Sequence, residues 1–157
     1  MWTIWAGERE RVDDSFRVFA SSRTVRFAES EQAVAREHAA EAVQAVSKVL
    51  ERHPVNFPIE LRFVAADDAL LSPSHGRDSA YIAVHVYRGK AMDPVLREVE
   101  SVLAQYGNWP HWGKRTSLCA ADLAPRYPRW ADFTAARERF DPQRRFANDF
   151  TRRVLGS

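Results

Sequence analysis

Apolar and charged residues alternate in the segment 58–64. Its apolar positions are Ile59, Leu61 and Phe63, and Glu60 and Arg62 lie between them. A period of two is typical of a strand with one buried face, because successive side chains of a strand point to opposite sides. The pattern therefore predicts a half-buried strand that carries Glu60 and Arg62 together on its other face.

Weaker patterns precede this strand. Residues 1–15 show no clear period and are expected to form an irregular lead-in. The alternation in 16–20 and the run of Thr, Val, Arg and Phe at 24–27 predict two short extended segments.

From residue 31 to residue 53 the apolar residues are spaced three and four apart, which predicts an amphipathic helix. Ser30 is the predicted N-cap of this helix. Glu29 and Glu31 would then lie near the positive end of its dipole. Pro54 is expected to end the helix, because proline has no amide N–H.

Both patterns recur in the next part of the chain. Residues 79–87 alternate again and predict a second clear strand. One face of this strand would carry Ile82, Val84 and Val86, and the other Tyr81, Ala83, His85 and Tyr87. Asp93 and Pro94 are typical of a helix start and Gly107 of a helix end. The predicted buried stripe of that helix is Val95, Leu96, Val99, Val102, Leu103 and Tyr106.

Residues 16–107 therefore read strand–helix–strand–strand–helix. Two helices of this kind bury their stripes on one face of a mainly antiparallel sheet, which predicts an α+β fold of ferredoxin-like character. Short helices are predicted at 120–127 and 130–140, and 141–157 is a basic tail. We expect a single domain over 16–157 with a helical C-terminal segment.

The composition changes this picture little. The chain has 157 residues, of which 45% are hydrophobic and 28% charged, and its formal net charge is +2. This imbalance is too small to indicate binding to nucleic acid or an anionic membrane. The single Cys119 excludes an intrachain disulfide and fits a reducing compartment. No apolar run approaches the ~20 residues of a membrane span, and the start lacks a signal-peptide core, so we expect a cytoplasmic protein.

Glu60 and Arg62 are the first candidates for chemistry. They lie on one face of the predicted strand, roughly 7 Å apart along it. A carboxylate that accepts hydrogen bonds and a guanidinium that donates several can form a fork for a polyhydroxylated ligand. His85 lies on a neighbouring strand and is a candidate donor or acceptor to the same ligand. The alternative for Glu60 and Arg62 is an ordinary surface ion pair.

The loop 108–114 is the second candidate. It holds two tryptophans with His111 and Lys114 around a proline and a glycine, and such a turn can place an ammonium group near developing negative charge. The alternative is a tryptophan-anchored loop whose lysine points to water. The histidine spacing predicts no metal site, and no glycine-rich phosphate loop is present.

Several of these stretches occur in one known family, in the same order. The most specific are Pro-x-Glu-x-Arg at 58–62 and His-Trp-Gly-Lys at 111–114, supported by Val-Arg-Phe-Ala-Glu-Ser-Glu at 25–31, Arg-Asp at 77–78 and Arg-Phe-Asp-Pro at 139–142. Together they resemble the C-terminal part of the FAD-dependent sugar-1,4-lactone and alditol oxidoreductases, the D-arabinono-1,4-lactone oxidase type of the vanillyl-alcohol oxidase superfamily. The resemblance is strongest to actinobacterial members that act on L-gulono-1,4-lactone.

The resemblance implies roles for the candidate residues. Glu60 and Arg62 would face the flavin and hold the substrate hydroxyls, and Arg62 would stabilise negative charge. Lys114 would lie by the isoalloxazine ring and share that work, with His111 beside it. The reaction implied is hydride transfer from a sugar carbon to flavin N5, with FAD supplying the hard chemistry.

His85 and Tyr87 would border the substrate pocket in such an enzyme. The substrate implied is a sugar-1,4-lactone of the L-gulono or D-arabinono type, or an alditol. Oxygen or another acceptor could take the electrons, because the family includes oxidases and dehydrogenases. Some family members also associate peripherally with membranes.

Family members have a separate FAD-binding domain, and nothing in these 157 residues resembles it. The resemblance thus implies a substrate or cap domain that needs a flavin-binding domain or subunit and is inactive or nearly so alone. An exposed sheet face is expected to favour self-association. Two alternatives stay open: a non-catalytic, RNA-recognition-like binding module and a decayed enzyme fragment.

Overall fold

A computed structural model describes residues 12–19, 24–53 and 55–156 of the chain. Its elements, in order, are α1 (Ser15–Phe19), β1 (Phe27–Ala35), the 3-10 helix η1 (Arg36–His38), α2 (Ala39–Leu50), β2 (Glu60–Val64), β3 (Ser79–Tyr87), α3 (Asp93–Ala104), β4 (Trp109–Pro110), α4 (Ala120–Leu123), α5 (Trp130–Phe140) and α6 (Asp149–Leu155). None of the described helices is long and apolar enough to cross a membrane.

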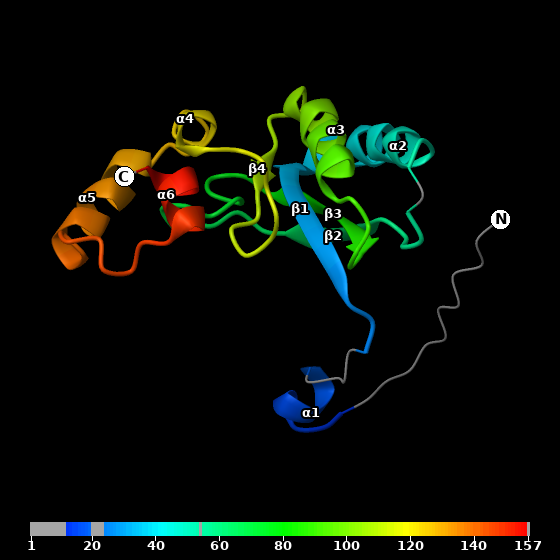
Figure 1. Ribbon diagram of the computed structural model, residues 1–157, viewed down its shortest axis with the longest axis horizontal. Helices are drawn as coiled ribbons and strands as arrows, with labels where there is room; N and C mark the ends of the chain where they lie inside the picture. The colour runs from blue at the N-terminus through cyan, green and yellow to red at the C-terminus, as the bar shows by residue number, and fades with distance from the viewer. Residues whose placement is uncertain (1–11, 20–23, 54, 157) are drawn as a thin grey trace.

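The four strands form one antiparallel sheet in the order β2-β3-β1-β4. The chain runs β1-α2-β2-β3-α3-β4, so each helix connects two strands that are separated by a third (Figure 1). This is the ferredoxin-like, split β-α-β arrangement that the sequence predicts. The α+β fold class is confirmed.

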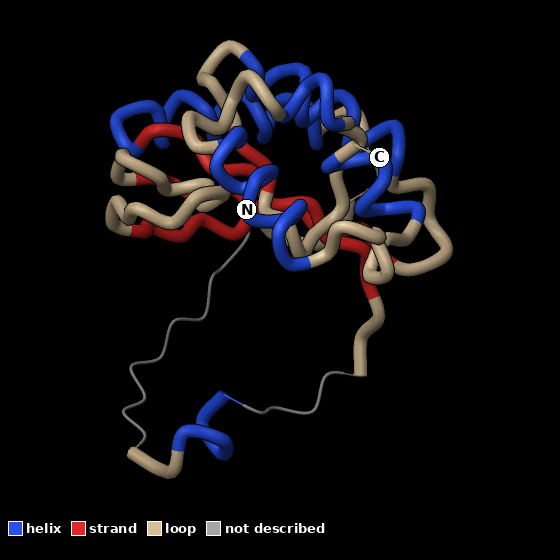
Figure 2. Tube along the Cα trace, turned by 90° about the vertical axis from the view of Figure 1, so that its left-hand side faces the viewer, coloured by secondary structure: helices blue, strands red, loops and turns tan. Residues whose placement is uncertain are grey.

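Helices α2 and α3 lie side by side on one face of the sheet, and the strands form a layer beneath them (Figure 2). Their apolar stripes meet the inner face of β3. The buried core formed there includes Val46, Val49, Ile82, Val84, Val86, Val95, Leu96, Val99 and Leu103. α2 and α3 cover one face only, so the opposite face of the sheet is free of these two helices, although Tyr81 and His85 on it are each only 8% exposed.

The predictions for β3 and α5 are confirmed, and α3 is present but starts one residue early, with Met92 rather than Asp93 as its N-cap. β3 has the predicted bounds and faces, and α5 spans the predicted 130–140. Gly107 follows α3 with a φ of 62°, a left-handed conformation that glycine adopts without strain. The tail contains a further helix, α6, which its basic composition did not predict.

The predicted helix over 31–53 is wrong in its first third. Residues 27–35 form β1, and the helix begins only at Ala39. Ser30 is not an N-cap but a buried residue in the middle of this strand. The inner face of β1 carries Ser30 and Gln32 and its outer face Glu29 and Glu31, so the apolar contrast that identifies a strand is weak there.

One predicted strand is wrong, and a second, β2, is present but more exposed than predicted. The segment 16–20 was expected to be a strand, but Ser15–Phe19 is a short helix, and Ala20 lies outside the described residues. In β2, Leu61 and Phe63 are 41% and 53% exposed rather than half-buried. β2 is an edge strand, which explains this exposure because only one of its sides is covered by a neighbour.

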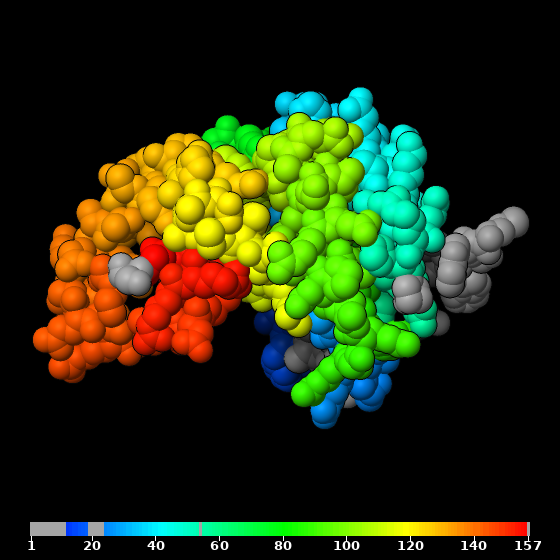
Figure 3. All heavy atoms as spheres, turned by 45° about the horizontal axis from the view of Figure 1, so that its top comes forward, coloured from blue at the N-terminus to red at the C-terminus, as the bar shows by residue number. Residues whose placement is uncertain are grey.

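The C-terminal helices build a second, smaller core. Leu123, Tyr127 and Val154 are its fully buried members, with Trp109, Trp112 and Trp130 packed against them. In the space-filling view, α5 and α6 (orange to red) form a lobe that joins α3 through the 110–123 region (Figure 3). This arrangement fixes the tryptophan loop between the two cores.

Candidate active site

Charged side chains gather on the sheet face that the helices leave open. Glu29 and Glu31 project from β1, Glu60 and Arg62 from β2, and His85 from β3 between them. In the strand register Glu29 lies opposite His85, while Glu31 and Glu60 flank the same residue of β3. The five side chains therefore share one face, as alternation requires. We call this group, together with Lys114, the charged wall.

Arg62 is held by two carboxylates. Its Nη1 donates to Glu31 Oε1 at 2.5 Å, and its Nε and Nη2 lie 3.0 and 2.7 Å from Glu60 Oε1. Burial works against the charged guanidinium, but Glu31 and Glu60 outweigh it, so the pKa of Arg62 is raised. The predicted Glu60–Arg62 fork is present, and a second carboxylate has joined it.

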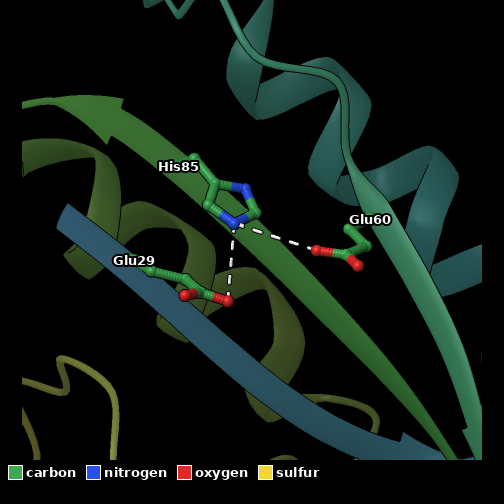
Figure 4. A group of neighbouring side chains, drawn as sticks. All are labelled: Glu29, Glu60 and His85. Carbon is green, nitrogen blue, oxygen red and sulfur yellow. Dashed lines mark ion pairs between the residues drawn. The ribbon is translucent and has the colours of Figure 1, made fainter. Parts of the chain in front are cut away.

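His85 of β3 lies between Glu29 of β1 and Glu60 of β2. Its Nε2 lies 3.4 Å from Glu29 Oε1 and 3.9 Å from Glu60 Oε2, and the three side chains point toward one another (Figure 4). Phe27 and Phe57 pack around the imidazole ring. A ligand that reaches Glu60 therefore also meets His85.

Glu29, Glu60 and His85 bring their ligand atoms within 4.8 Å of one another, as a cation site would. The histidine spacing did not predict this cluster, because its members come from three strands. Lys114 and Arg62 already supply positive charge to the two carboxylates.

Lys114 reaches the wall from the loop after β4. The loop runs along the edge of β1: the N–H of His111 donates to the carbonyl of Glu31, and that of Arg115 to the carbonyl of Glu29, both at 2.9 Å. The ammonium group of Lys114 forms an ion pair with Glu29, and its side chain is 26% exposed. The lysine thus faces the carboxylates of the sheet. The alternative, a lysine that points to open water, is wrong.

His111 and Tyr81 line a hollow beside Arg62. The hollow measures about 340 Å³ and also includes Glu31 and Trp112 in its lining. The Nδ1 of His111 accepts a hydrogen bond from the Gly113 N–H at 3.0 Å, which leaves Nε2 as the nitrogen available to a ligand. Burial raises the pKa of Tyr81, whose hydroxyl lies 3.1 Å from that of Ser74.

Tyr87 lies at the end of β3, further from the charges. Its ring packs on Phe57 with centroids 4.6 Å apart, and 40% of the residue is exposed. It shares a face with His85 but forms no ion pair or hydrogen bond with the wall among the described residues. The structure therefore places Tyr87 at the rim of the candidate site.

The two tryptophans of the loop anchor it to the second core, and Trp112 also lines the hollow beside Arg62. Trp112 donates from Nε1 to the carbonyl of Leu71 at 2.7 Å and packs on Tyr127 and Trp130. Trp109 packs on Tyr127 and lies under the guanidinium of Arg77 at 4.1 Å. These contacts hold the loop rigidly and thereby fix the starting point of the Lys114 side chain.

Tyr127 gives this anchor a measurable pH dependence. Burial raises the pKa of its hydroxyl, which donates to the carbonyl of Pro110 at 3.2 Å. Above about pH 10 the unfolded chain loses this proton while the folded chain keeps it, so stability should fall by up to about 1.4 kcal/mol per pH unit. In urea unfolding between pH 9 and 11.5, Tyr127→Phe should flatten the decline, whereas Tyr87→Phe should not. An unchanged slope in Tyr127→Phe would show that this hydroxyl is not linked to folding.

A buried polar network lies directly beneath the loop. Glu100, which is 5% exposed, accepts hydrogen bonds from the hydroxyls of Thr116 and Ser117, from the backbone N–H of Ser117 and from the side-chain amide of Gln32. The side-chain oxygen of Gln32 accepts a hydrogen bond from the side-chain amide of Asn108 at 2.9 Å. This network ties α3 to β1 and to both ends of the loop that carries Lys114.

Sequence reasoning missed the two carboxylates of β1. Glu29 and Glu31 were placed at a helix start, yet each forms an ion pair with one of the predicted cations. The signal that could have found them is their own spacing. Two glutamates two residues apart, directly after the extended run at 24–27, would share a face if the strand continued.

Comparisons with known proteins indicate one family of enzymes. A family model described as D-arabinono-1,4-lactone oxidase matches residues 1–154. Over 146 residues the chain is 50% identical to the L-gulono-1,4-lactone dehydrogenase of Mycobacterium tuberculosis (strain ATCC 25618 / H37Rv), covering 92% of this chain and 34% of that protein.

Two further relatives are more distant. The chain is 41% identical over 131 residues to the alditol oxidase of Streptomyces sp., covering 81% of this chain and 31% of that protein. It is 30% identical over 161 residues to the L-gulonolactone oxidase of Bos taurus, covering 98% of this chain and 37% of that protein. The chain thus spans about a third of the length of these relatives.

Proposed function

Because this chain belongs to the D-arabinono-1,4-lactone oxidase family, we propose that it is the substrate-side domain of an FAD-dependent oxidoreductase that acts on a sugar-1,4-lactone or an alditol. The observation that carries the proposal is the charged wall. Glu60 and Arg62 lie on β2, and Lys114, from a distant part of the sequence, reaches the same face of the sheet through its ion pair with Glu29. Hydrogen-bonding groups of both kinds then face any ligand on this side of the sheet.

The wall suits a neutral polyhydroxylated ligand. It carries three carboxylates (Glu29, Glu31 and Glu60) against the two cations Arg62 and Lys114, and each cation already contacts a carboxylate. An anionic substrate would face excess negative charge, whereas sugar hydroxyls can donate to Glu60 and accept from Arg62. A lactone of the L-gulono or D-arabinono type and an alditol both meet this requirement.

The residues present fit the ring end of FAD. Arg62 and Lys114 are partly exposed cations on an uncovered face, which is where a flavin ring could lie against them. When bound, FAD would supply the acceptor, flavin N5, for the hydride that leaves the sugar carbon. Glu60 would hold the reacting hydroxyl and accept the proton that it loses as the carbon gives up its hydride, His85 would border it, and Arg62 and Lys114 would stabilise the negative charge that develops on its oxygen.

The flavin-binding partner is part of the proposal. The wall is one-sided, and an open face excludes too little water to act as a redox pocket by itself. We therefore propose that a flavin-binding domain or subunit closes this face, that the chain alone is inactive or nearly so, and that the enzyme is cytoplasmic. The cap-domain role within the vanillyl-alcohol oxidase superfamily follows from the same proposal.

The RNA-recognition-like alternative is less well supported. Its sheet face would need stacking aromatics and basic groups, but the middle of this face carries Glu29, Glu31 and Glu60. These carboxylates would repel phosphates. We therefore propose no role in nucleic-acid binding.

Co-expression tests the proposal. The chain should be produced with the part of the Mycobacterium tuberculosis dehydrogenase that it does not cover. We expect a yellow complex that reduces a dye acceptor when L-gulono-1,4-lactone or an alditol is added, while each part alone stays inactive. If both parts fold but do not associate, or if the yellow complex oxidises no lactone or alditol, the proposed function is wrong.

A further inference from the structure

The two carboxylates of β1 differ from Glu60 in their surroundings. The side chain of Glu31 is 2% exposed and that of Glu29 11% exposed, whereas Glu60 is 44% exposed. Both lie on β1, which has a strand on each side, while Glu60 lies on the edge strand β2. Glu29 and Glu31 are thus rigid, largely dry groups that an arriving ligand reaches less easily than Glu60.

The orientation of the Arg62 guanidinium depends on this difference in exposure between Glu31 and Glu60. Its pair with Glu60 joins two residues of one edge strand, each close to half exposed, and such pairs are mobile and weak. Glu31 accepts a hydrogen bond from the third nitrogen of the guanidinium at 2.5 Å, and it does so from β1, on the far side of β3. Two carboxylates on different strands fix the plane of the guanidinium, and one N–H on each terminal nitrogen stays available to a ligand.

Lys114 has a similar support. Its side chain is long and rotatable, and among the described residues Glu29 is the ion-pair partner that fixes its ammonium group. The backbone of the same β1 residue accepts the N–H of Arg115 at 2.9 Å. Glu29 therefore holds both the loop and the charge that the loop presents.

We propose that Glu31 and Glu29 are positioning residues that orient Arg62 and Lys114, respectively, toward the substrate. This inference rests on the proposed function for its catalytic part. It assigns these carboxylates a role through the cations rather than direct contact with the reacting atoms. The two cations then keep a fixed separation, because their supports are two residues apart on one strand.

The first test needs no flavin. In the isolated chain, nitrogen NMR of the Arg62 guanidinium should show separate signals for its two terminal nitrogens, because Glu31 restricts their rotation; Arg62→Lys assigns the signals. Glu31→Ala should merge them, and Glu31→Gln, which keeps an acceptor oxygen, should keep them apart. The matched control is Glu98→Ala, which removes an ion pair with Arg52 on the helix layer and should change nothing. Separate signals in Glu31→Ala would overturn the proposal.

The second test uses the co-expressed complex. Glu31→Ala and Glu29→Ala should each lower kcat about 10- to 100-fold and change KM by less than about threefold, because the cations are misplaced while the hydroxyl contacts of Glu60 remain. Glu31→Gln should recover most of the kcat, which a merely structural role would not explain. Unchanged kcat in both alanine variants would overturn the positioning role. A wild-type complex that oxidises no lactone would instead overturn the proposed function, and the NMR result would still show whether Glu31 orients Arg62.

Discussion

Arg62→Ala is expected to lower kcat/KM of the co-expressed complex for its lactone by about 10²–10³, the effect of removing one donor that stabilises a developing charge. Arg62 donates hydrogen bonds to carboxylates of two strands, Glu31 of β1 and Glu60 of β2, and its raised pKa keeps it charged throughout the accessible pH range. The loss should appear mainly in kcat, because Glu60 still holds the substrate hydroxyls. Steady-state kinetics with a dye acceptor measures this effect.

Two variants make this result interpretable. Arg62→Lys keeps the charge but not the planar fork, so it should recover only part of the activity. Arg129→Ala removes an arginine that pairs with Asp132 on the surface of α5, and it should leave turnover unchanged. Arg62→Ala leaves the buried Glu31 without its partner and is therefore expected to destabilise the complex. The thermal midpoint of each complex should be measured first, and turnover should then be compared at a temperature below the unfolding range of both. Full turnover by a folded Arg62→Ala complex would remove Arg62 from the catalytic machinery.

Glu100→Ala is expected to lower the free energy of unfolding of the chain by about 3 kcal/mol or more, the largest stability loss that we predict for a single side chain. Glu100 is 5% exposed and accepts hydrogen bonds from Gln32, Thr116 and Ser117. Its removal leaves these donors buried without an acceptor. Urea unfolding followed by circular dichroism measures the loss.

Glu98→Ala is the matched control, because Glu98 lies on the same helix two residues away. Its side chain is 44% exposed and pairs with the exposed Arg52 and with His53, so its removal should lower the urea midpoint far less than removal of Glu100. Glu100→Gln should be intermediate, since one acceptor oxygen remains. Equal midpoints for Glu98→Ala and Glu100→Ala would mean that the buried network contributes nothing to stability.

The sequence predicts those elements whose two faces differ clearly. β3 alternates between core residues and Tyr81, Ala83, His85 and Tyr87, and its bounds are correct to the residue. The strand β1 is not predicted because its inner face carries the polar residues Ser30 and Gln32. The hydrogen-bond partner of Gln32 is Glu100, which lies 68 residues further along the chain. A local pattern contains no information on such a distant partner, so a polar residue with a buried bond looks like a solvent-facing one.

The same limit applies to the site. The alternation of β2 predicts that Glu60 and Arg62 share a face, which the structure confirms. The strand order and the register decide that Glu31 and His85 lie next to them, and neither can be read from one strand alone. The contact of Lys114 with Glu29 bridges 85 residues and depends on the path of the loop along β1.

Anaerobic mixing of the co-expressed complex with a sugar-1,4-lactone tests the central claim most directly, because bleaching of the flavin reports hydride transfer without any external electron acceptor. The claim is that Glu60, Arg62 and Lys114 act together as one wall of the redox site. We expect the lactone to bleach the flavin absorption of the wild type and of Arg129→Ala rapidly, and that of the triple variant Glu60→Gln, Arg62→Ala, Lys114→Ala at least about 10³ times more slowly. Bleaching of the triple variant at the wild-type rate would contradict the account.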